Sequence, residues 1–205
     1  MYLPSKIAAR VCVGASRKGP ALVQQTARML VCCLLLLGAH AACAAVTPEA
    51  FLRGAFADAL PAPQAMFLSA DVRARIEHVL GHRTPLLRIR YWRRASRSVW
   101  ILDEIGKEQP ITTGVQVDAG RISQVRVLKY RESRGAEVQR ESFTAQFRDA
   151  RLNEADMLDR RIDGITGATL SVRALTRQAR VALILHASLP AESGGPSAHA
   201  QLQRP

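Results

Sequence analysis

Seven residues near the C-terminal end of the chain, DGITGAT from Asp163 to Thr169, combine a carboxylate, two hydroxyls and two glycines. Apolar side chains at helical spacing follow in residues 170–189, so the seven residues form the entry to a helix. The first turn of a helix has unpaired backbone N–H groups and the positive end of the helix dipole, which together attract an anion. Gly164 and Gly167 let the backbone turn and approach a ligand closely. A phosphate held here could be bound non-covalently or joined to the Thr169 hydroxyl.

Each of these features also has a plain structural interpretation. The Asp163 carboxylate could orient a group or hold a cation, but an Asp before a Gly is ordinary turn chemistry. Glycine-rich turns precede many helices, and threonine is a common helix cap. Physical reasoning from these residues alone therefore favours a helix cap over a phosphate site.

Two other sets of side chains are weaker candidates. His78 and His82 are four residues apart, a spacing that can bind a metal ion on a helix, but no third ligand is evident and Gly81 should end that helix. Trp92 and Trp100 could shield a bound ring, although aromatic residues of strands are more often part of the core. The sequence therefore predicts surface histidines, no metal site and buried tryptophans.

The charge of the chain is strongly positive and unevenly distributed. The 205 residues include 29 basic and 17 acidic side chains, for a formal net charge of +12. The first 45 residues hold five basic side chains and no acidic one, which leaves a net charge of +7 beyond them. The arginines are scattered apart from a cluster in residues 88–97, and no recognition helix, zinc finger or RNA-binding signature is present. We expect a solvated basic surface and no nucleic-acid partner.

The first 44 residues have the three parts of a secretory signal peptide. Basic residues lead into an apolar run, residues 29–38, and small residues around an Ala-x-Ala site follow. The run is shorter than the roughly 20 residues that span a bilayer. Cleavage after Ala41 or Ala44 would fit, so we expect the protein to be exported.

All four cysteines lie in this leader, at positions 12, 32, 33 and 43. A lipoprotein signal with Cys43 as the acceptor is the weaker alternative, because His40 stands where an aliphatic residue is expected. A chain cut after Ala44 has no cysteine, which excludes disulfides, cysteine metal ligands and cysteine nucleophiles.

Residues 45–84 are predicted to form an N-terminal helical segment. Capping residues and apolar spacing indicate two helices, one from Thr47 to about Leu60 and one from Ser69 to Gly81. At the other end, residues 190–205 are rich in Gly, Pro and Ser and are expected to form a disordered tail.

Residues 85–189 are predicted to form one α+β domain. From about residue 86 to residue 130 the apolar side chains alternate or are β-branched, and Ala119-Gly120 marks a hairpin with a bulge near Gln124. One or two short helices should follow, and then a long helix over residues 169–189 with a buried second half. The expected fold is an antiparallel sheet packed against helices, with the long C-terminal helix after the DGITGAT turn.

The DGITGAT turn resembles the covalent flavinylation motif of the FMN-binding domain family. That family includes components of the sodium-pumping NADH:quinone reductase and of Rnf complexes, together with many small exported flavoproteins. In it the last threonine of the motif carries FMN through a phosphoester, installed by an FAD:protein FMN transferase. The resemblance implies that Thr169 is the acceptor, that Asp163 is the acid the transferase requires, and that Gly167-Ala168 are the small residues beside the acceptor. The implied cofactor-binding stretch is Asp163, Gly164, Ile165, Thr166, Gly167, Ala168, Thr169 and Leu170.

The resemblance extends over roughly Arg88 to His186. Within it, residues 105–138 are similar to the family's strand–turn–strand followed by a glutamate-led loop. The four residues of that loop stand where relatives often carry Glu-Thr-Pro-Gly near the flavin ring, with an arginine in place of the proline. They are Glu132, Ser133, Arg134 and Gly135. Glu132 has no partner carboxylate at a readable spacing, so acid/base catalysis is not indicated.

Taken together, the resemblance and the leader imply an exported flavoprotein with covalent FMN on Thr169, located in the periplasm or on the outer face of the inner membrane. It would pass electrons between a membrane-bound reductase and a periplasmic carrier, as a membrane-associated redox module more than a free-standing enzyme. The phosphoester would make it a phosphoprotein, and the transferase would be its maturation partner. The alternative is an exported, non-catalytic binding module without flavin, in which the turn at Asp163 is only a helix cap.

Overall fold

A computed structural model describes residues 46–57 and 59–190 of the chain. The predicted leader and the predicted tail from residue 191 onward lie outside the described residues. Within the described ranges, no helix is both long and apolar enough to cross a bilayer. The helices and strands are, in chain order, α2 (Pro48–Phe56), β1 (Gln64–Phe67), α3 (Ala70–Leu80), β2 (Arg88–Arg94), β3 (Arg97–Ile105), β4 (Pro110–Asp118), β5 (Arg121–Lys129), η1 (Ala136–Gln139), α4 (Glu141–Thr144), η2 (Ala145–Phe147) and α5 (Thr169–Ala187).

The five strands form one antiparallel sheet in which the spatial order β1-β2-β3-β4-β5 is also the chain order. Ala119 and Gly120 join β4 to β5 with φ angles of 47° and 76°, the left-handed pair that a two-residue hairpin turn of the I′ type requires. The register changes after the pair Gln116↔Gln124, because Val117 pairs with Ile122 and leaves Ser123 without an opposite residue. This is the bulge that the sequence predicted.

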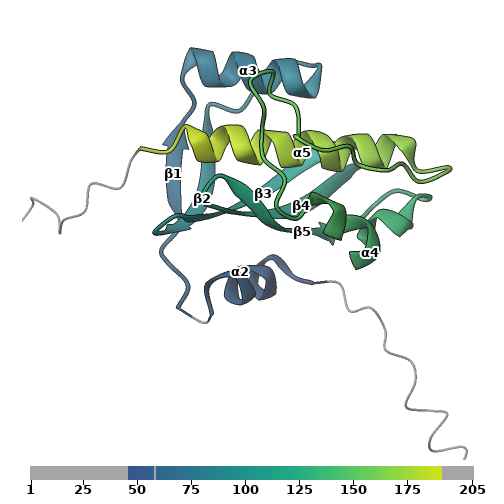
Figure 1. Ribbon diagram of the computed structural model, residues 1–205, viewed down its shortest axis with the longest axis horizontal. Coiled ribbons are helices and arrows are strands. Elements are labelled where there is room, and N and C mark those ends of the chain that lie inside the picture. Colours follow the sequence, from purple (N-terminus) through teal and green to yellow (C-terminus); the bar gives the residue numbers. More distant parts are fainter. Residues whose placement is uncertain (1–45, 58, 191–205) are drawn as a thin grey trace, which may run out of the picture. The chain divides into compact units, whose positions relative to one another are not determined.

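Helix α5 covers one face of the sheet (Figure 1). Successive side chains of a strand point to opposite faces, and the inward set of β3 and β4 includes Trp100 and Val115, both fully buried. They pack in one cluster with Leu175 and Ala182 of α5. The helix forms here because its buried positions recur at three- and four-residue intervals, which places them on one side.

Helix α2 covers the opposite face of the sheet (Figure 1). Its Phe51 and Leu52 pack against Val99 and Leu128 in a second, smaller cluster. Gly114 makes this packing possible, since a Cβ atom at that position would lie 2.5 Å from the Phe51 ring. Both faces of the sheet are therefore covered by helix.

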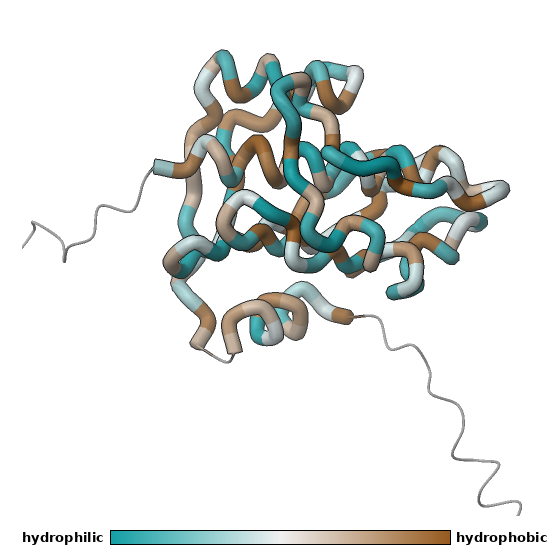
Figure 2. The backbone as a smooth tube through the Cα atoms, in the orientation of Figure 1, coloured by the Kyte–Doolittle hydropathy of each residue, from teal (hydrophilic) through white to brown (hydrophobic). Residues whose placement is uncertain are grey.

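A segment without long helices, residues 148–168, connects η2 to α5 across the molecule and is mostly hydrophilic (Figure 2). Its first residues are tied to β5, because the Ile122 N–H donates to the Ala150 carbonyl at 2.9 Å and the Asp149 N–H donates to the Ile122 carbonyl at 2.7 Å. Further along, Asp156 pairs with Arg75 of α3. These ties hold the first half of the segment against β5 and α3.

His186, in the last turn of α5, is linked to the sheet through both ring nitrogens. Its Nε2 accepts the Gly120 N–H at 3.2 Å, so Nε2 carries no proton. Its Nδ1 lies 2.7 Å from the Ser98 hydroxyl, which also accepts the Trp100 indole N–H at 2.9 Å. Burial, and then the charge of Arg93, lower the pKa of His186, so the neutral ring is the form that the fold stabilises.

The predicted fold class is confirmed: the domain is α+β, with an antiparallel sheet and a long C-terminal helix. Both helices predicted within residues 45–84 are present, and β1, which the sequence analysis did not predict, lies between them and pairs with β2. Helix α2 also ends at Phe56 rather than near Leu60, since Ala57 adopts the left-handed conformation with φ 47°. Gly81 ends α3 in the same conformation, as expected.

Candidate functional site

The DGITGAT turn leads directly into α5. Residues 165–168, the last four before the helix, form a turn that is closed by the Ala168 N–H, which donates to the Ile165 carbonyl at 2.9 Å. Gly167 occupies the third position of this turn with φ 82°, a conformation that side chains rarely adopt and that glycine takes without strain. A Cβ atom at Gly167 would meet nothing within 4 Å, so the space beside the turn is open.

Thr169 is the first residue of α5 and is exposed. The residue before it, Ala168, provides no side-chain cap, and the first backbone bond of the helix runs from the Val172 N–H to the Ala168 carbonyl at 3.0 Å. The N–H groups of Thr169, Leu170 and Ser171 therefore have no capping group and are available to an anion. The predicted helix cap is absent, although the sequence analysis favoured it when the residues were considered alone.

The loop after β5 lies against this helix start. A Cβ atom at Gly135, which has φ 84°, would be 3.0 Å from the Ala168 Cβ and 3.2 Å from the Ser171 hydroxyl oxygen. The Tyr130 hydroxyl donates to the Arg134 carbonyl and lies 3.0 Å from the Ser171 hydroxyl. Because the tyrosine proton points to the carbonyl, Ser171 is the donor in the second contact. The structure thus brings together the two stretches that the family resemblance singled out.

Glu132 of the same loop points toward the turn between β3 and β4. Its Oε1 accepts the backbone N–H groups of Lys107, Glu108 and Gln109, the last two at 2.8 and 3.0 Å. The N–H of Gln109 first, and those of Glu108 and Lys107 after it, lower the pKa of Glu132. A Cβ atom at Gly106 would lie 2.7 Å from that carboxylate oxygen, so glycine is needed for the approach. This carboxylate holds the turn and remains ionised.

The remaining residues of the two stretches are mostly exposed. The Asp163 N–H donates to the Gln146 Oε1 at 2.8 Å, while none of the described residues pairs with its carboxylate. Ile165 packs partly against the core, which anchors the turn. The side chains that face solvent are those of Ser133, Arg134, Thr166 and Leu170, together with the backbone of Gly164.

A basic groove adjoins Thr169. It has a volume of about 430 Å³ and is lined by α5 and by Val79 of α3. Three arginines of α5 contribute to it at four- and three-residue spacing, which places them on the outward face of the helix together with Thr169. Arg173 is exposed, and Arg177 lies 3.3 Å from Glu104. The groove lining comprises Val79, Thr169, Val172, Arg173, Thr176, Arg177 and Arg180.

Residues 106–184 match the family model of the FMN-binding domain. The match confirms the predicted resemblance and indicates a flavin-binding protein. It runs from the turn held by Glu132, through β4 and β5, to the second half of α5, so it includes every residue of the two stretches. No curated protein matches the chain.

The geometry of the matched region suits FMN at the phosphate end. The uncapped N–H groups at the start of α5 suit a phosphate, the open side of Gly167 leaves room for it, and the exposed Thr169 hydroxyl is the nearest side-chain oxygen in the helix. Arg173 is one turn beyond Thr169 on the same face, where its charge offsets that of an anion. Sequence reasoning missed Tyr130 and Ser171, because their meeting depends on the packing of the loop on the helix.

The weaker candidates have structural roles in the described part of the chain. No group of three or more His, Cys, Asp or Glu side chains there could hold a metal ion. His82 lies beyond the end of α3, where it contacts Glu104 at 3.2 Å. Trp100 is fully buried against Tyr91, and Trp92 packs in the cluster under α2. Neither tryptophan lies at the start of α5.

Proposed function

We propose that this protein is an exported electron-transfer flavoprotein that carries FMN on Thr169 through a phosphoester. The observation that carries the proposal is the exposed Thr169 at an uncapped helix start, within residues that match the FMN-binding domain. FMN, when bound, supplies one- and two-electron transfer. The residues of the chain would hold the phosphate and leave the redox-active ring within reach of partners.

Attachment needs an acceptor oxygen that an enzyme can reach. The Thr169 hydroxyl would lose its proton and bond to the FMN phosphorus of FAD, with AMP as the leaving group. Its exposure and the lack of a capping bond leave the oxygen free for that reaction. The free carboxylate of Asp163 lies in the same exposed turn, which suits the role of the acid that the transferase requires.

The first turn of α5 would then stabilise the product. A phosphodiester keeps one negative charge, and the three N–H groups of residues 169–171 offset it together with the helix dipole. A covalent bond removes the need for tight non-covalent binding of the ring, so an exposed flavin that meets its partners directly is compatible with an open site. The partners we propose are a membrane-bound reductase and a periplasmic electron carrier, with the FMN transferase as the maturation enzyme.

Export is supported by the predicted leader of residues 1–44, which lies outside the described residues. Covalent attachment suits an exported carrier, because FMN that dissociated outside the cytoplasm would be lost. We therefore propose the periplasm or the outer face of the inner membrane as the location. An intact mass of protein purified from the periplasm would measure leader removal and flavin attachment together.

The test of attachment is co-expression of the chain with an FAD:protein FMN transferase, followed by denaturing electrophoresis and flavin fluorescence of the band. We expect a fluorescent wild-type band whose mass exceeds that of the peptide by FMN less one water. Thr169→Ala should abolish the fluorescence while the protein stays folded, because Thr169 is exposed and Ala is a good helix former.

Ser96→Ala is the matched control, since Ser96 is an exposed hydroxyl residue of the β2–β3 turn, outside the motif, and the substitution should leave attachment unchanged. Asp163→Ala should block attachment without affecting folding. A dark wild-type band, or a fluorescent Thr169→Ala band, would contradict the proposal and leave a binding module without covalent flavin.

A further inference from the structure

The sheet is not continuous between β2 and β3. These strands pair only from Tyr91↔Trp100 to Arg94↔Arg97. Beyond that point Ile101–Ile105 of β3 pairs with β4 alone, and Arg88–Arg90 of β2 pairs with β1 alone. The two strands therefore separate and leave a gap inside the sheet.

The strand register shows which backbone groups face this gap. A two-residue turn joins β2 to β3, so the pair that flanks the turn, Arg94↔Arg97, is hydrogen-bonded. Because hydrogen-bonded and non-hydrogen-bonded pairs alternate, every second residue of β3 from Arg97 onward points its N–H and C=O groups toward β2. The residues of β3 whose backbone groups point toward β2 therefore include Ile101, Asp103 and Ile105. The pairing of Ile105 with Pro110 agrees, because a proline has no N–H for a hydrogen-bonded pair.

The last pair, Tyr91↔Trp100, lies between hydrogen-bonded positions, so the ladder ends with the bond from the Ile101 N–H to the Arg90 carbonyl. Past that bond, the gap-facing groups of Asp103 and Ile105 have no partner in the described part of the chain. No residue of β2 pairs with Asp103 or Ile105, and no loop or side-chain hydrogen bond there reaches their N–H or C=O groups. By the same alternation, Arg88 directs both of its backbone groups, and Arg90 its N–H, into the gap from β2. The gap thus has an unpaired strand edge on both sides, which is the template that an added strand uses.

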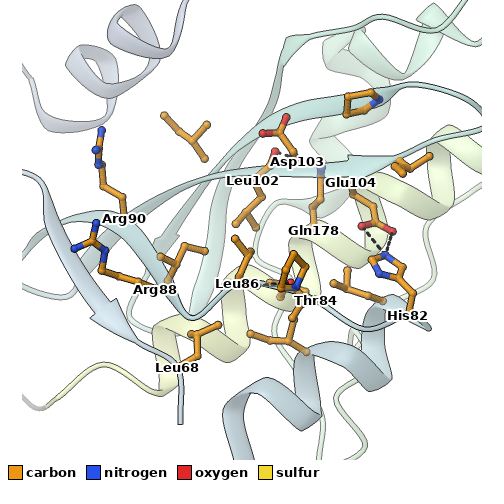
Figure 3. A pocket seen from close by; sticks show the side chains of 18 residues that line it. Leu68, His82, Thr84, Leu86, Arg88, Arg90, Leu102, Asp103, Glu104 and Gln178 are labelled. Atoms are coloured by element: carbon orange, nitrogen blue, oxygen red, sulfur yellow. Dashed lines mark hydrogen bonds and ion pairs between the residues drawn. The ribbon is translucent and has the colours of Figure 1, made fainter. Parts of the chain in front are cut away.

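A cavity of about 440 Å³ occupies the gap (Figure 3). Leu68, Leu86 and Leu102 lie between the two arginines on one side and the His82–Glu104 contact on the other (Figure 3). Helix side chains, among them Leu80 and Val181, complete an apolar wall. Apolar side chains also reach solvent at the rim, where Leu86 is 46% and Ile105 is 59% exposed.

We propose that the gap binds an extended peptide of a partner protein, which adds a strand to the free edge of β3 at Ile101–Ile105. The edge is long enough for about five residues. Side chains on one side of the peptide would enter the apolar wall and should be hydrophobic. Those on the other side meet the exposed face of Arg88 and Arg90, neither of which has an ion-pair partner among the described residues, and should include an acid. The inference does not depend on bound flavin.

Asp103→Pro tests the edge directly. The Asp103 N–H faces the gap and takes no part in the pairing with β4, so proline removes a gap-facing donor and spares the existing sheet. Asp103→Ala is the matched control, because it keeps that N–H and loses only the carboxylate, which accepts the Thr112 hydroxyl. Circular dichroism and thermal unfolding would establish that both variants are folded.

The probe is a random-peptide library displayed on phage and selected on the purified protein. We expect sequences with alternating apolar residues and an acid, whose affinity falls by at least about tenfold in Asp103→Pro through the lost hydrogen bond and the added ring. In Asp103→Ala the affinity should change by less than about threefold. The proposal is overturned if nothing is enriched, or if the selected peptides bind folded Asp103→Pro as well as wild type.

Amide hydrogen exchange gives a second reading without any ligand. In the free protein the amides of Asp103 and Ile105 should exchange faster than those of Leu102 and Glu104, which face β4. A selected peptide should slow the exchange of the first two. Equal protection of all four in the free protein would show that the edge is already covered. If sedimentation then shows a dimer that Asp103→Pro disrupts, a second copy of the chain is the occupant and the partner-peptide proposal is wrong.

Discussion

Replacement of Gly135 by alanine tests the contact between the loop after β5 and the start of α5. Gly135 has φ 84°, where an L side chain costs about 1–2 kcal/mol of stability. Its new Cβ would also lie 2.9 Å from the Tyr130 hydroxyl, 3.0 Å from the Ala168 Cβ and 3.2 Å from the Ser171 hydroxyl. The Ala168 Cβ is fixed to the backbone of the helix start and cannot yield without moving it. Overpacking of this kind costs about 1–3 kcal/mol more.

Gly120→Ala separates the conformational cost of a positive φ angle from the cost of overpacking. Gly120 has φ 76°, but a Cβ atom there would meet nothing within 4 Å, so only the conformational cost of about 1–2 kcal/mol applies. We therefore expect the free energy of unfolding to fall by about 2–5 kcal/mol in Gly135→Ala and by about 1–2 kcal/mol in Gly120→Ala.

Urea denaturation of both variants and wild type measures these changes. The shift of Ala168 should also reduce flavin attachment in Gly135→Ala, read as in-gel fluorescence at equal protein, while Gly120→Ala retains it. If Gly135→Ala is no more destabilising than Gly120→Ala, the loop does not press on the helix start and the reasoning fails.

Two further substitutions test ionisable groups of the fold. Because the pKa of His186 is lowered in the folded protein, the unfolded chain binds a proton more readily below pH about 6.5, and stability should fall there by up to about 1.4 kcal/mol per pH unit. His186→Gln should remove this pH dependence of the free energy of unfolding between pH 8 and pH 5, measured by urea denaturation at each pH. The pKa of His82 is raised, which has the opposite effect on stability, but this contribution is common to both proteins and cancels in their difference. Identical pH profiles of wild type and His186→Gln would contradict the assignment. Glu132→Ala leaves three N–H groups without their acceptor and should destabilise the protein by about 1–2 kcal/mol at pH 7. The control, Glu108→Ala, changes an exposed side chain and should alter the free energy of unfolding by less than about 0.5 kcal/mol in the same denaturation assay. A Glu132→Ala protein as stable as Glu108→Ala would show that the carboxylate does not hold the turn.

The sheet from β2 to β5 and helix α5 could be predicted because their buried residues follow the two-residue period of a strand and the 3.6-residue period of a helix. In β3, Val99 and Trp100 alternate between opposite faces, and in α5 the buried positions return every three or four residues. Strand β1 could not be predicted in this way. Its four residues are almost all exposed, so no alternation marks them, and the strand exists because β2 offers a free edge.

The site shows the same division between local and long-range causes. The open turn at Gly167 and the position of Thr169 at a helix start follow from neighbouring residues, and the sequence predicted both. The contact of Gly135 with Ala168 joins residues far apart in the chain, and no local pattern reveals it. The hydrogen bonds from the backbone N–H groups of residues 107–109 to Glu132 likewise depend on where the β3–β4 hairpin lies in the folded sheet.

The chain-ordered sheet has a consequence for how the domain folds. Every strand pairs with its neighbours in sequence, and the β2–β3 and β4–β5 connections are only two residues long, so little chain entropy is lost when these hairpins close. Mainly local pairings are associated with fast folding. Helices α2 and α5 both dock on strands that are distant in the chain, and α5, which also packs against α3, has the longest loop to close. The rate-limiting collapse should therefore involve the helix that begins at Thr169, and substitutions in its buried second half should slow folding more than substitutions in the hairpin turns.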